Sequence, residues 1–308
     1  MKHCFTIALS VLLLSGCQKN FLSEQENSLL TDDENSQVVP FVPGTIGRLQ
    51  LLTREVSFNS LNPSLKQVRE YYFDEENRCT KVLIGTIDSS GNVIPVFNLS
   101  RTLTFVYEGL STLPVKVQSV RTVFPNTITE FFYEYDSKGN KIKDSVRVSN
   151  QQGLPADRVV HYQYIKKDSV YSTPEFVNFP LTNNSFDTLY YSDHNIQKFR
   201  KHTITATGFN VNEYTFEYDN NINPYSALNV FNSLNLTNPA LGIGFNIQMQ
   251  TNYIGLNRNN ITGFTVAGAP FRFVINYLYD NYKYPVWSEA YPEGSANKLI
   301  TYYTYKQP

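Results

Sequence analysis

Hydrophobic and polar residues alternate one by one over most of the chain, and aromatic residues dominate one side of the alternation. In 212–219, Tyr214, Phe216 and Tyr218 occupy every second position, and polar residues fill the positions between them. The run 271–280 repeats this pattern. Because side chains of a β-strand point alternately to opposite faces, each run predicts a strand with one aromatic and one polar face. We therefore expect an all-β protein whose antiparallel sheet is wetted on one side.

Pairs of aromatic residues two positions apart recur along the chain at intervals near 28 residues. The pairs are Phe105/Tyr107, Tyr133/Tyr135, Tyr162/Tyr164, Phe216/Tyr218, Tyr277/Tyr279 and Tyr303/Tyr305. From Tyr107 to Tyr135 is 28 residues, and the 61 residues from Tyr218 to Tyr279 correspond to two periods. One period holds two long strands and two turns, so each unit predicts one β-hairpin. The predicted fold is an antiparallel meander of long hairpins, either an open curved sheet or barrel-like.

An aspartate directly follows several of the predicted strand ends. These residues are Asp74, Asp136, Asp219 and Asp280. A carboxylate at a strand end accepts hydrogen bonds from backbone N–H groups of the turn. In FFYEYDSKGNKIKD, residues 131–144, Gly139 and Asn140 then supply positions that tolerate a positive φ. Because the pattern recurs, we interpret all six residues as structural turn residues and not as a ligand loop.

The Tyr-Asp turn followed by Gly-Asn resembles the YD repeats of RHS-type proteins. The segments YDNNINPYSALN (218–229) and GLNRNNITGF (255–264) are similar to uncharacterised YD-repeat lipoproteins of Bacteroidetes. The resemblance extends loosely over most of 50–308, although the chain lacks the regular Gly-Arg strands of the RHS pattern. It implies a lipid-anchored β protein with a domain of unknown function.

The chain begins with an export signal that ends in a lipidation motif. A short basic start precedes the apolar run 5–14, which is shorter than the roughly 20 residues that a membrane-spanning helix needs. Leu-Ser-Gly-Cys at 14–17 resembles a bacterial lipobox, which implies a signal peptide over 1–16 and acylation of Cys17, palmitate included. Several acyl chains would hold the protein on a membrane. The alternative is an ordinary export signal with an incidental cysteine.

Residues 17–46 predict a flexible, lipid-anchored tether. They contain five acidic residues and one lysine, with Asn, Ser and Gln between them, a composition that cannot bury a core. The remainder, 47–308, predicts a single β domain with an irregular insertion at about 225–270, either a short helix or a long loop over the sheet. The expected location is the outer membrane, on its periplasmic or its cell-surface side.

Composition and charge argue against several classes of function. The net charge is −1 and no basic stripe is present, so we expect no nucleic-acid partner. Cys79 alone would remain outside the signal and the lipid site, which argues against a disulfide framework or a multi-cysteine metal site. Neither a paired-histidine metal motif nor a nucleophile elbow occurs. We expect no metal, no cofactor and no enzymatic activity.

Acidic residues at alternating positions are the basis of an alternative. Glu130, Glu134 and Asp136 share one strand face, and Glu217 and Asp219 repeat the spacing. Glycan-acting hydrolases use paired carboxylates, so such an enzyme is the second hypothesis. The acidic residues alternate with aromatic residues in several units, however, which is typical of a solvent-facing wall.

Aromatic residues are densest in YDNYKYPVW, residues 279–287. Tyr279, Tyr282, Tyr284 and Trp287 are candidates for binding a glycan or an envelope protein, because such rings stack on sugars and anchor interfaces. Packing between neighbouring strands is the alternative interpretation. The first hypothesis for function is therefore a lipid-anchored, non-catalytic binding or structural module of the cell envelope.

Two further patterns complete the predictions. Ser145, Ser169 and Thr188 follow an aspartate and precede an apolar residue, which resembles the O-glycosylation site of Bacteroidetes proteins. A membrane-spanning barrel is the less favoured arrangement, because it alternates lipid-facing apolar residues with polar lumen residues and would make a lipid anchor redundant.

Overall fold

A computed structural model describes most of the domain beyond the predicted tether. The described residues are 50–89, 96–137, 141–148, 158–166, 169–176, 185–193, 195–205, 208–225 and 257–307. The predicted signal peptide, Cys17, the tether, Gly139 and Asn140 lie outside these residues. None of the described residues belongs to a helix that is long and apolar enough to cross a membrane.

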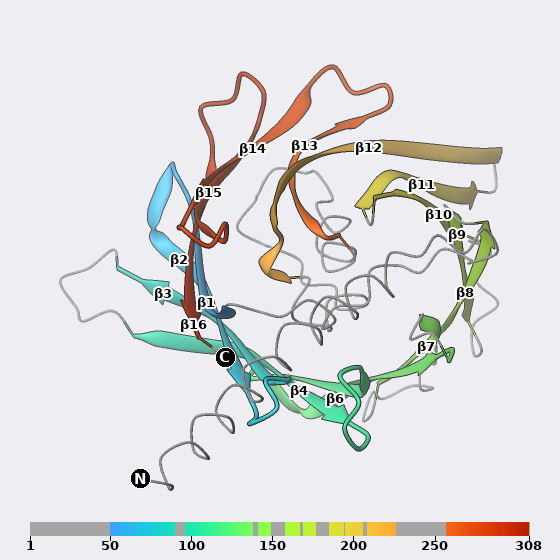
Figure 1. Ribbon diagram of the computed structural model, residues 1–308, viewed down its shortest axis with the longest axis horizontal. Helices are drawn as coiled ribbons and strands as arrows, with labels where there is room; N and C mark the ends of the chain where they lie inside the picture. Colours follow the sequence, from blue (N-terminus) through green and yellow to red (C-terminus); the bar gives the residue numbers. More distant parts are fainter. Residues whose placement is uncertain are drawn as a thin grey trace, which may run out of the picture. The chain divides into compact units, whose positions relative to one another are not determined.

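Within the described residues, sixteen antiparallel strands close into one barrel, in which each strand pairs with the strands before and after it. The strands are β1 (Leu51–Asn59), β2 (Asn62–Phe73), β3 (Cys79–Asp88), β4 (Phe97–Tyr107), β5 (Pro114–Arg121), β6 (Phe124–Tyr135), β7 (Lys141–Val148), β8 (Arg158–Lys166), β9 (Ser169–Phe176), β10 (Ser185–Ser192), β11 (Asn195–Thr205), β12 (Gly208–Ile222), β13 (Asn259–Val266), β14 (Arg272–Tyr279), β15 (Pro285–Pro292) and β16 (Leu299–Lys306). The last strand, β16, pairs with β1 and closes the ring (Figure 1). The predicted all-β antiparallel meander is confirmed, and of its two forms the barrel is the one observed.

The predicted insertion at about 225–270 extends too far along the chain. Of the 61 residues from Tyr218 to Tyr279, 226–256 lie outside the described residues, and the others include the end of β12 and the hairpin β13–β14. The predicted irregular insertion at 225–270 includes all of β13. A register shift against β12 interrupts the alternation of β13, so its sequence does not show the period of two.

The same β-bulge recurs where an even-numbered strand turns into the next odd-numbered strand. In each case the register shifts just before the last aromatic residue, which then pairs with the first residue of the following strand or, for Tyr191, with the second. The shifts follow Tyr72, Val106, Glu134, Tyr190 and Leu278. A bulge re-aims the residues beside it and increases the local twist. The recurring aromatic residues of the sequence therefore mark one rim of the barrel, where these five hairpins turn.

The aromatic side of the alternation faces the interior of the barrel. Tyr225 follows β12, yet its ring lies 6.4 Å from that of Tyr303 on β16 and packs in one cluster with Tyr71 of β2. Strands β12 and β2 are separated by β13 to β16 and β1 around the ring, so this contact crosses the inside. We call this face the inner wall and the opposite face the outer wall.

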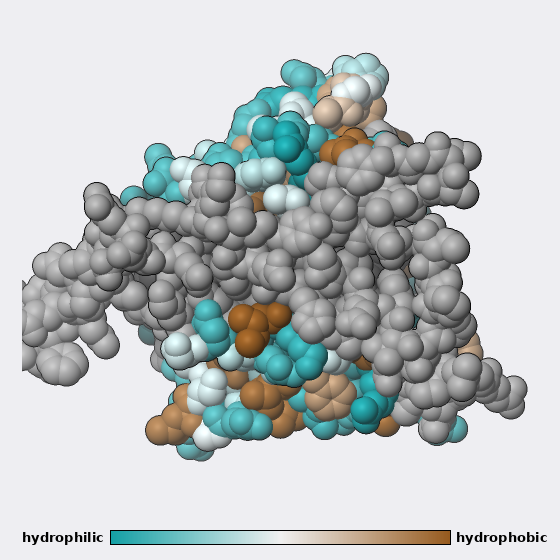
Figure 2. Space-filling view, turned by 90° about the vertical axis from the view of Figure 1, so that its right-hand side faces the viewer, coloured by the Kyte–Doolittle hydropathy of each residue, from teal (hydrophilic) through white to brown (hydrophobic). Residues whose placement is uncertain are grey.

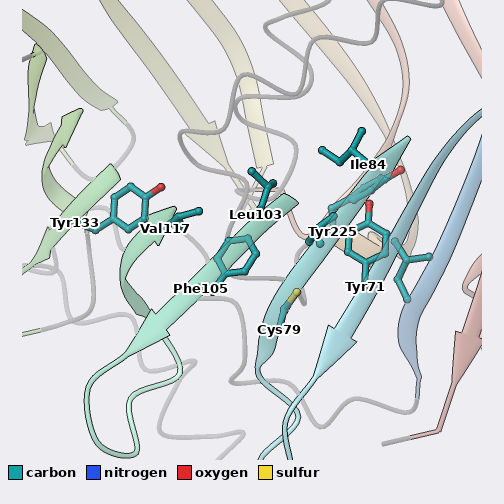
Figure 3. Packing of buried hydrophobic residues seen from close by; sticks show 10 residues of the cluster. Tyr71, Cys79, Ile84, Leu103, Phe105, Val117, Tyr133 and Tyr225 are labelled. Carbon is teal, nitrogen blue, oxygen red and sulfur yellow. The ribbon is translucent and has the colours of Figure 1, made fainter. Parts of the chain in front are cut away.

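Two hydrophobic clusters cover the inner wall. The first is centred on β2 to β6 and includes Leu103, Val117 and the thiol of Cys79, all buried (Figure 3). The second spans β10 to β14 and includes Phe199 and the stacked rings of Phe264 and Phe273. Burial of these side chains is the largest favourable contribution to folding in the described domain.

Candidate functional site

A buried ionic cluster lies on the inner wall beside the seam between β1 and β16. Glu55 of β1 stands directly opposite Arg69 of β2 in the strand register, and Tyr71 is the next inner-wall residue of β2. Arg69 Nη1 donates to Glu55 Oε1 at 3.1 Å and to Oε2 at 3.3 Å. The Tyr71 hydroxyl donates to Oε2 at 3.0 Å. All three side chains are buried, so the strand pairing holds charged groups together away from water.

Hydroxyl groups extend this cluster across the seam. Ser57 donates to Glu55 Oε1 at 3.4 Å and lies 3.0 Å from the Thr301 hydroxyl of β16. On the next strand pair, the hydroxyls of Ser288 and Tyr303 are 3.0 Å apart. Buried polar groups are tolerated when they are hydrogen-bonded, and this chain of contacts meets that requirement along β15, β16 and β1.

The electrostatics of the cluster support a buried salt bridge. Burial works against the charged form of Arg69, but the charge and hydrogen bond of Glu55, with smaller contributions from Tyr71 and Tyr225, together outweigh it and raise the pKa of Arg69. Burial and the same carboxylate also raise the pKa of the Tyr71 hydroxyl. The Glu55 carboxylate accepts hydrogen bonds from Arg69, Tyr71 and Ser57, so donors from β1 and β2 hold it in place. Buried Arg69 Nε has no hydrogen-bond acceptor among the described residues.

The carboxylates of the hydrolase hypothesis lie with basic or amide groups. Glu130 accepts a hydrogen bond from Gln118 Nε2 at 2.9 Å, which lowers the pKa of Glu130, and Lys116 lies 3.5 Å away. Glu134 pairs with Lys143, and Glu217 pairs with Arg272. None of these three stands beside a second carboxylate in an ion pair or hydrogen bond of the described residues. No group of three or more His, Cys, Asp or Glu within the described ranges is placed to hold a metal ion.

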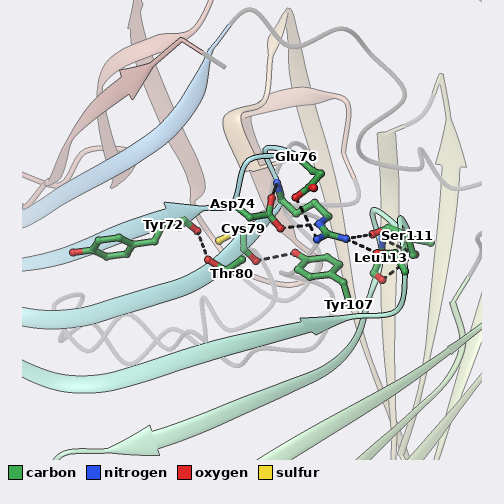
Figure 4. Close-up of polar contacts among 10 residues, drawn as sticks. Tyr72, Asp74, Glu76, Cys79, Thr80, Tyr107, Ser111 and Leu113 are labelled. Carbon is green, nitrogen blue, oxygen red and sulfur yellow. Dashed lines mark hydrogen bonds and ion pairs between the residues drawn. The ribbon is translucent and has the colours of Figure 1, made fainter.

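The turn aspartates take two different positions. The carboxylate of Asp74 accepts the backbone N–H of Arg78 at 2.8 Å (Figure 4). In the β14–β15 turn, Asp280 accepts the N–H groups of Tyr282 and Tyr284 at 2.9 and 3.0 Å. Both turns continue through a residue with positive φ three positions after the aspartate, Asn77 and Lys283. Asp136 directly follows β6, at the position corresponding to Asp74 and Asp280.

Asp219 differs from the other three because it lies inside β12. Its carboxylate accepts the backbone N–H of Asn221 at 2.9 Å and that of Asn260 at 3.2 Å. The Tyr279 hydroxyl also donates to it. Asn260 therefore fastens the start of β13 to β12, and this contact explains part of the asparagine-rich sequence at 255–264. Asp219 was expected in a hairpin turn and instead joins three strands.

Tyrosine hydroxyls on the inner wall reach across to the neighbouring strand at the same rim. In five places the hydroxyl donates a hydrogen bond to a backbone carbonyl, at 2.5–3.0 Å. The pairs are Tyr107 to Cys79, Tyr135 to Pro114, Tyr218 to Ile196, Tyr277 to Ile261 and Tyr305 to Pro285. Figure 4 shows the first of them beside the Asp74 turn. The repeated aromatic residues thus satisfy carbonyls next to the bulges as well as filling the interior.

The predicted binding aromatics do not form one surface. Tyr284 is buried against Tyr305 of β16, with ring centroids 5.3 Å apart, and Tyr279 is engaged with Asp219. Tyr282 is exposed in the β14–β15 turn, whereas Trp287 lies on the outer wall. The four rings are therefore divided: the turn and its bulge send two of them to the inner wall and leave two outside.

Trp287 belongs instead to a row of apolar residues on the outer wall. Leu278, Trp287, Tyr302 and Val56 are successive neighbours across β14, β15, β16 and β1, and we call them the outer apolar row. Leu278 is 60% exposed and Tyr302 is 50% exposed. Arg54 lies two residues from the row on β1, and the hydrogen-bonded Asn276 and Glu289 lie two residues from it on β14 and β15. On the other side of Val56, Phe58 extends the apolar surface by stacking on Tyr302, with ring centroids 6.1 Å apart. A polar or charged residue therefore limits the row on at least one side of β1, β14 and β15.

Ion pairs occupy much of the remaining outer wall. They are Arg54–Glu70, Lys116–Glu130, Lys143–Glu134, Arg200–Glu213, Arg272–Glu217 and Lys298–Glu289. Arg272 reaches Glu217 across β13 because the strand between them carries Gly263, where an added Cβ would lie 2.8 Å from Arg272 Nη2. In Figure 2, hydrophilic and hydrophobic residues lie side by side over the coloured part of the surface.

The candidate O-glycosylation residues all lie in strands. Thr188 is buried in β10, so a glycan on it is no longer expected. Ser145 is half-buried in β7, opposite Phe132, and Ser169 is the first residue of β9. Modification of Ser145 and Ser169 stays a prediction.

Sequence reasoning missed the charged residues of the inner wall. Glu55, Arg69 and Arg101 each occupy a position that the alternation assigns to the apolar side of a strand. A charge at such a position was the available signal. It does not tell which charges meet, because Glu55 and Arg69 are brought together only by the β1–β2 register.

Comparisons with known proteins give a fold and no family. Neither a protein-family model nor a curated protein matches the sequence. The chain is similar to the crystal structure of a porin-like protein from Bacteroides uniformis, with a TM-score of 0.52, 14% identity and coverage of 83% of this chain and 96% of that one. A porin-like protein from Bacteroides vulgatus gives 0.50 and 13%, with 83% and 99% covered. At these identities the likeness extends to the β architecture alone.

Proposed function

We propose that this protein is a lipid-anchored, non-catalytic binding module of the cell envelope whose barrel stands in water beside the outer membrane. The observation that carries the proposal is the ion-paired outer wall. A barrel that spans a bilayer presents an apolar band about 25 Å tall to the lipid, and a central Arg or Lys on that face costs about 2–4 kcal/mol.

The outer apolar row is too narrow to serve as such a band. Successive outward residues of a strand are about 7 Å apart. Polar or charged groups stand two positions from Leu278, Trp287 and Val56. The apolar height at these strands is therefore well below the height of a hydrocarbon core. The lipobox-like sequence at Cys17 supplies a different attachment, acyl chains on a tether.

Attachment through Cys17 is tested by substitution of that residue. We expect a Cys17→Ser variant, expressed from the full chain with its signal, to leave the membrane fraction and appear as soluble, folded protein. A matched variant, Cys79→Ser, should stay with the membrane, because Cys79 is a core thiol. Retention of Cys17→Ser in membranes after alkaline extraction would contradict the proposal and favour a spanning barrel.

The partner that we assign to the outer apolar row is a glycan. Trp287 and Tyr302 offer adjacent aromatic faces, and Asn276 and Glu289 lie next to them as polar groups for hydroxyls. A glycan array with the full-length protein tests this assignment. Binding should be lost in Trp287→Ala and retained in Phe132→Ala, an aromatic outer-wall residue on β6. Equal binding by both variants would reject the row as the site.

A further inference from the structure

We infer that the inner wall binds an oxyanion group, the carboxylate or sulfate of an acidic saccharide, through Arg101 and Arg121. The two arginines stand directly opposite each other on β4 and β5. They occupy the same face as Leu103 and Ser119, which are buried on the inner wall. Directly opposed residues of an antiparallel pair have Cβ atoms about 5 Å apart, close enough for both guanidinium groups to contact one anion.

This pair of positive charges is not neutralised within the described part of the chain. No ion pair or hydrogen bond links either guanidinium group to a described carboxylate. The other pairs of charged residues described above that face each other across neighbouring strands each join a positive and a negative side chain. Like charges directly opposite each other destabilise a sheet. Partial burial and the proximity of Arg121 lower the pKa of Arg101, which fits an uncompensated cationic environment.

A third arginine points to the same region. The strand register places Arg69, Ile84, Arg101 and Arg121 side by side on β2, β3, β4 and β5, and we call this set the arginine row. Glu55 is the carboxylate that contacts the row, through Arg69. Arg69 is buried, and its Nε has no acceptor among the described residues. Among the described residues, three guanidinium groups and one carboxylate leave a net positive charge on this part of the inner wall.

The pair is also accessible to a ligand. Arg121 is the last residue of β5 and is exposed, and Arg101 is half-buried beside it. The following turn is fixed to β4 by a hydrogen bond from Thr122 N to Ser100 O at 3.0 Å. The arginines therefore stand at a structured mouth of the interior. Planar guanidinium forks match the two oxygens of a carboxylate or sulfate, which is why we assign an oxyanion and not a neutral sugar.

Thermal unfolding of the purified full-length protein tests this inference. The melting temperature is recorded against increasing sodium glucuronate, with sodium chloride at equal ionic strength and neutral glucose as references. A bound ligand raises the melting temperature in a concentration-dependent manner. We expect glucuronate to raise it and glucose to leave it unchanged. Loss of each arginine should weaken apparent affinity about tenfold, since hydrogen bonds to charged groups are among the stronger ones.

Two variants separate a site from a general salt effect. Arg101→Gln/Arg121→Gln should lose the glucuronate response, whereas Arg54→Gln, which removes an outer-wall arginine, should keep it. A parallel series with sodium sulfate identifies the oxyanion; because sulfate stabilises many proteins by exclusion from their surfaces, only the response lost in the double variant counts as binding. A wild-type protein that ignores both anions, or a double variant that responds like the wild type, would overturn the inference.

A stability measurement distinguishes this site from a structural role for the pair. In chloride alone, Arg121→Gln should unfold at the same temperature as the wild type or higher, because it removes repulsion between like charges. A lower melting temperature in chloride, together with an unchanged response to glucuronate, would show that Arg121 supports the fold and does not bind the anion.

Discussion

The inner and outer walls of the barrel are formed by the same strands but are held by different interactions. The inner wall carries two hydrophobic clusters, a buried salt bridge and tyrosine hydroxyls that bond to backbone carbonyls. The outer wall carries ion pairs between exposed or half-exposed side chains. Exposed ion pairs contribute about 0–1 kcal/mol each, whereas a buried leucine or phenylalanine contributes several times more. Most of the stability of the described domain is therefore expected from the inner wall.

Breaking a salt bridge is expected to give the largest difference in stability between the inner and the outer wall. Replacing Arg69 with Met leaves Glu55 buried without its cation and should lower the free energy of unfolding by about 3–5 kcal/mol. Replacing Arg200 with Met, which breaks the outer pair with Glu213, should lower it by less than about 1 kcal/mol. Denaturant unfolding of both full-length variants measures the two values.

A double variant provides the control for that experiment. Glu55→Gln/Arg69→Met removes both charges and should recover part of the stability lost in Arg69→Met alone, because an uncompensated buried charge is the main penalty. Equal losses for Arg69→Met and Arg200→Met would show that the two walls do not differ in this respect.

Leucines on the two walls give the next comparison. Leu103 is fully buried in the first cluster, and its truncation to Ala should cost about 2–5 kcal/mol through lost burial and a residual cavity. Leu278 belongs to the outer apolar row, and Leu278→Ala should change stability by no more than about 0.5 kcal/mol. The shift in the denaturation midpoint reports both. A large effect of Leu278→Ala would mean that the outer row is covered in the folded protein.

Removal of a tyrosine hydroxyl is expected to give the smallest difference in stability between the inner and the outer wall. Tyr305→Phe removes the hydrogen bond to the Pro285 carbonyl, which is 2.7 Å long, and should destabilise the protein by about 1 kcal/mol. Tyr302 lies on the same strand but is exposed, so Tyr302→Phe should leave the stability almost unchanged. Melting curves of the two variants test this. If both are neutral, the recurring tyrosines act through their rings and not through their hydroxyls.

Features that depend on local sequence were predictable. Alternation identified the strands, and the aromatic residue followed by Asp marked hairpin turns at Asp74 and Asp280. Closure of the barrel was not predictable, because it depends on twist and stagger accumulated over all sixteen strands. A period of two says which residues share a face and does not say whether that face becomes the inside of a ring.

The candidate sites depended on information that the sequence does not carry. Glu55 and Arg69 meet through the register of β1 and β2, and Arg101 and Arg121 meet through the register of β4 and β5. The dense aromatic stretch near Trp287 was misleading for a related reason. A turn and a bulge interrupt its alternation, so residues that are close in sequence reach opposite walls.

The seam between β1 and β16 has a consequence for how the molecule folds. Every other ladder joins strands that follow each other in the chain, whereas the seam joins residues such as Ser57 and Thr301, 244 positions apart. The entropy of closing a loop grows with the logarithm of its length, so this ladder costs about 3–4 kcal/mol more to close than a short hairpin. The pairing of β1 with β16 should therefore form late, after the local hairpins have formed. It should also be the first pairing to open when the protein is heated or partly denatured. Amide hydrogen exchange would register it as the least protected pair of strands in an otherwise stable ring.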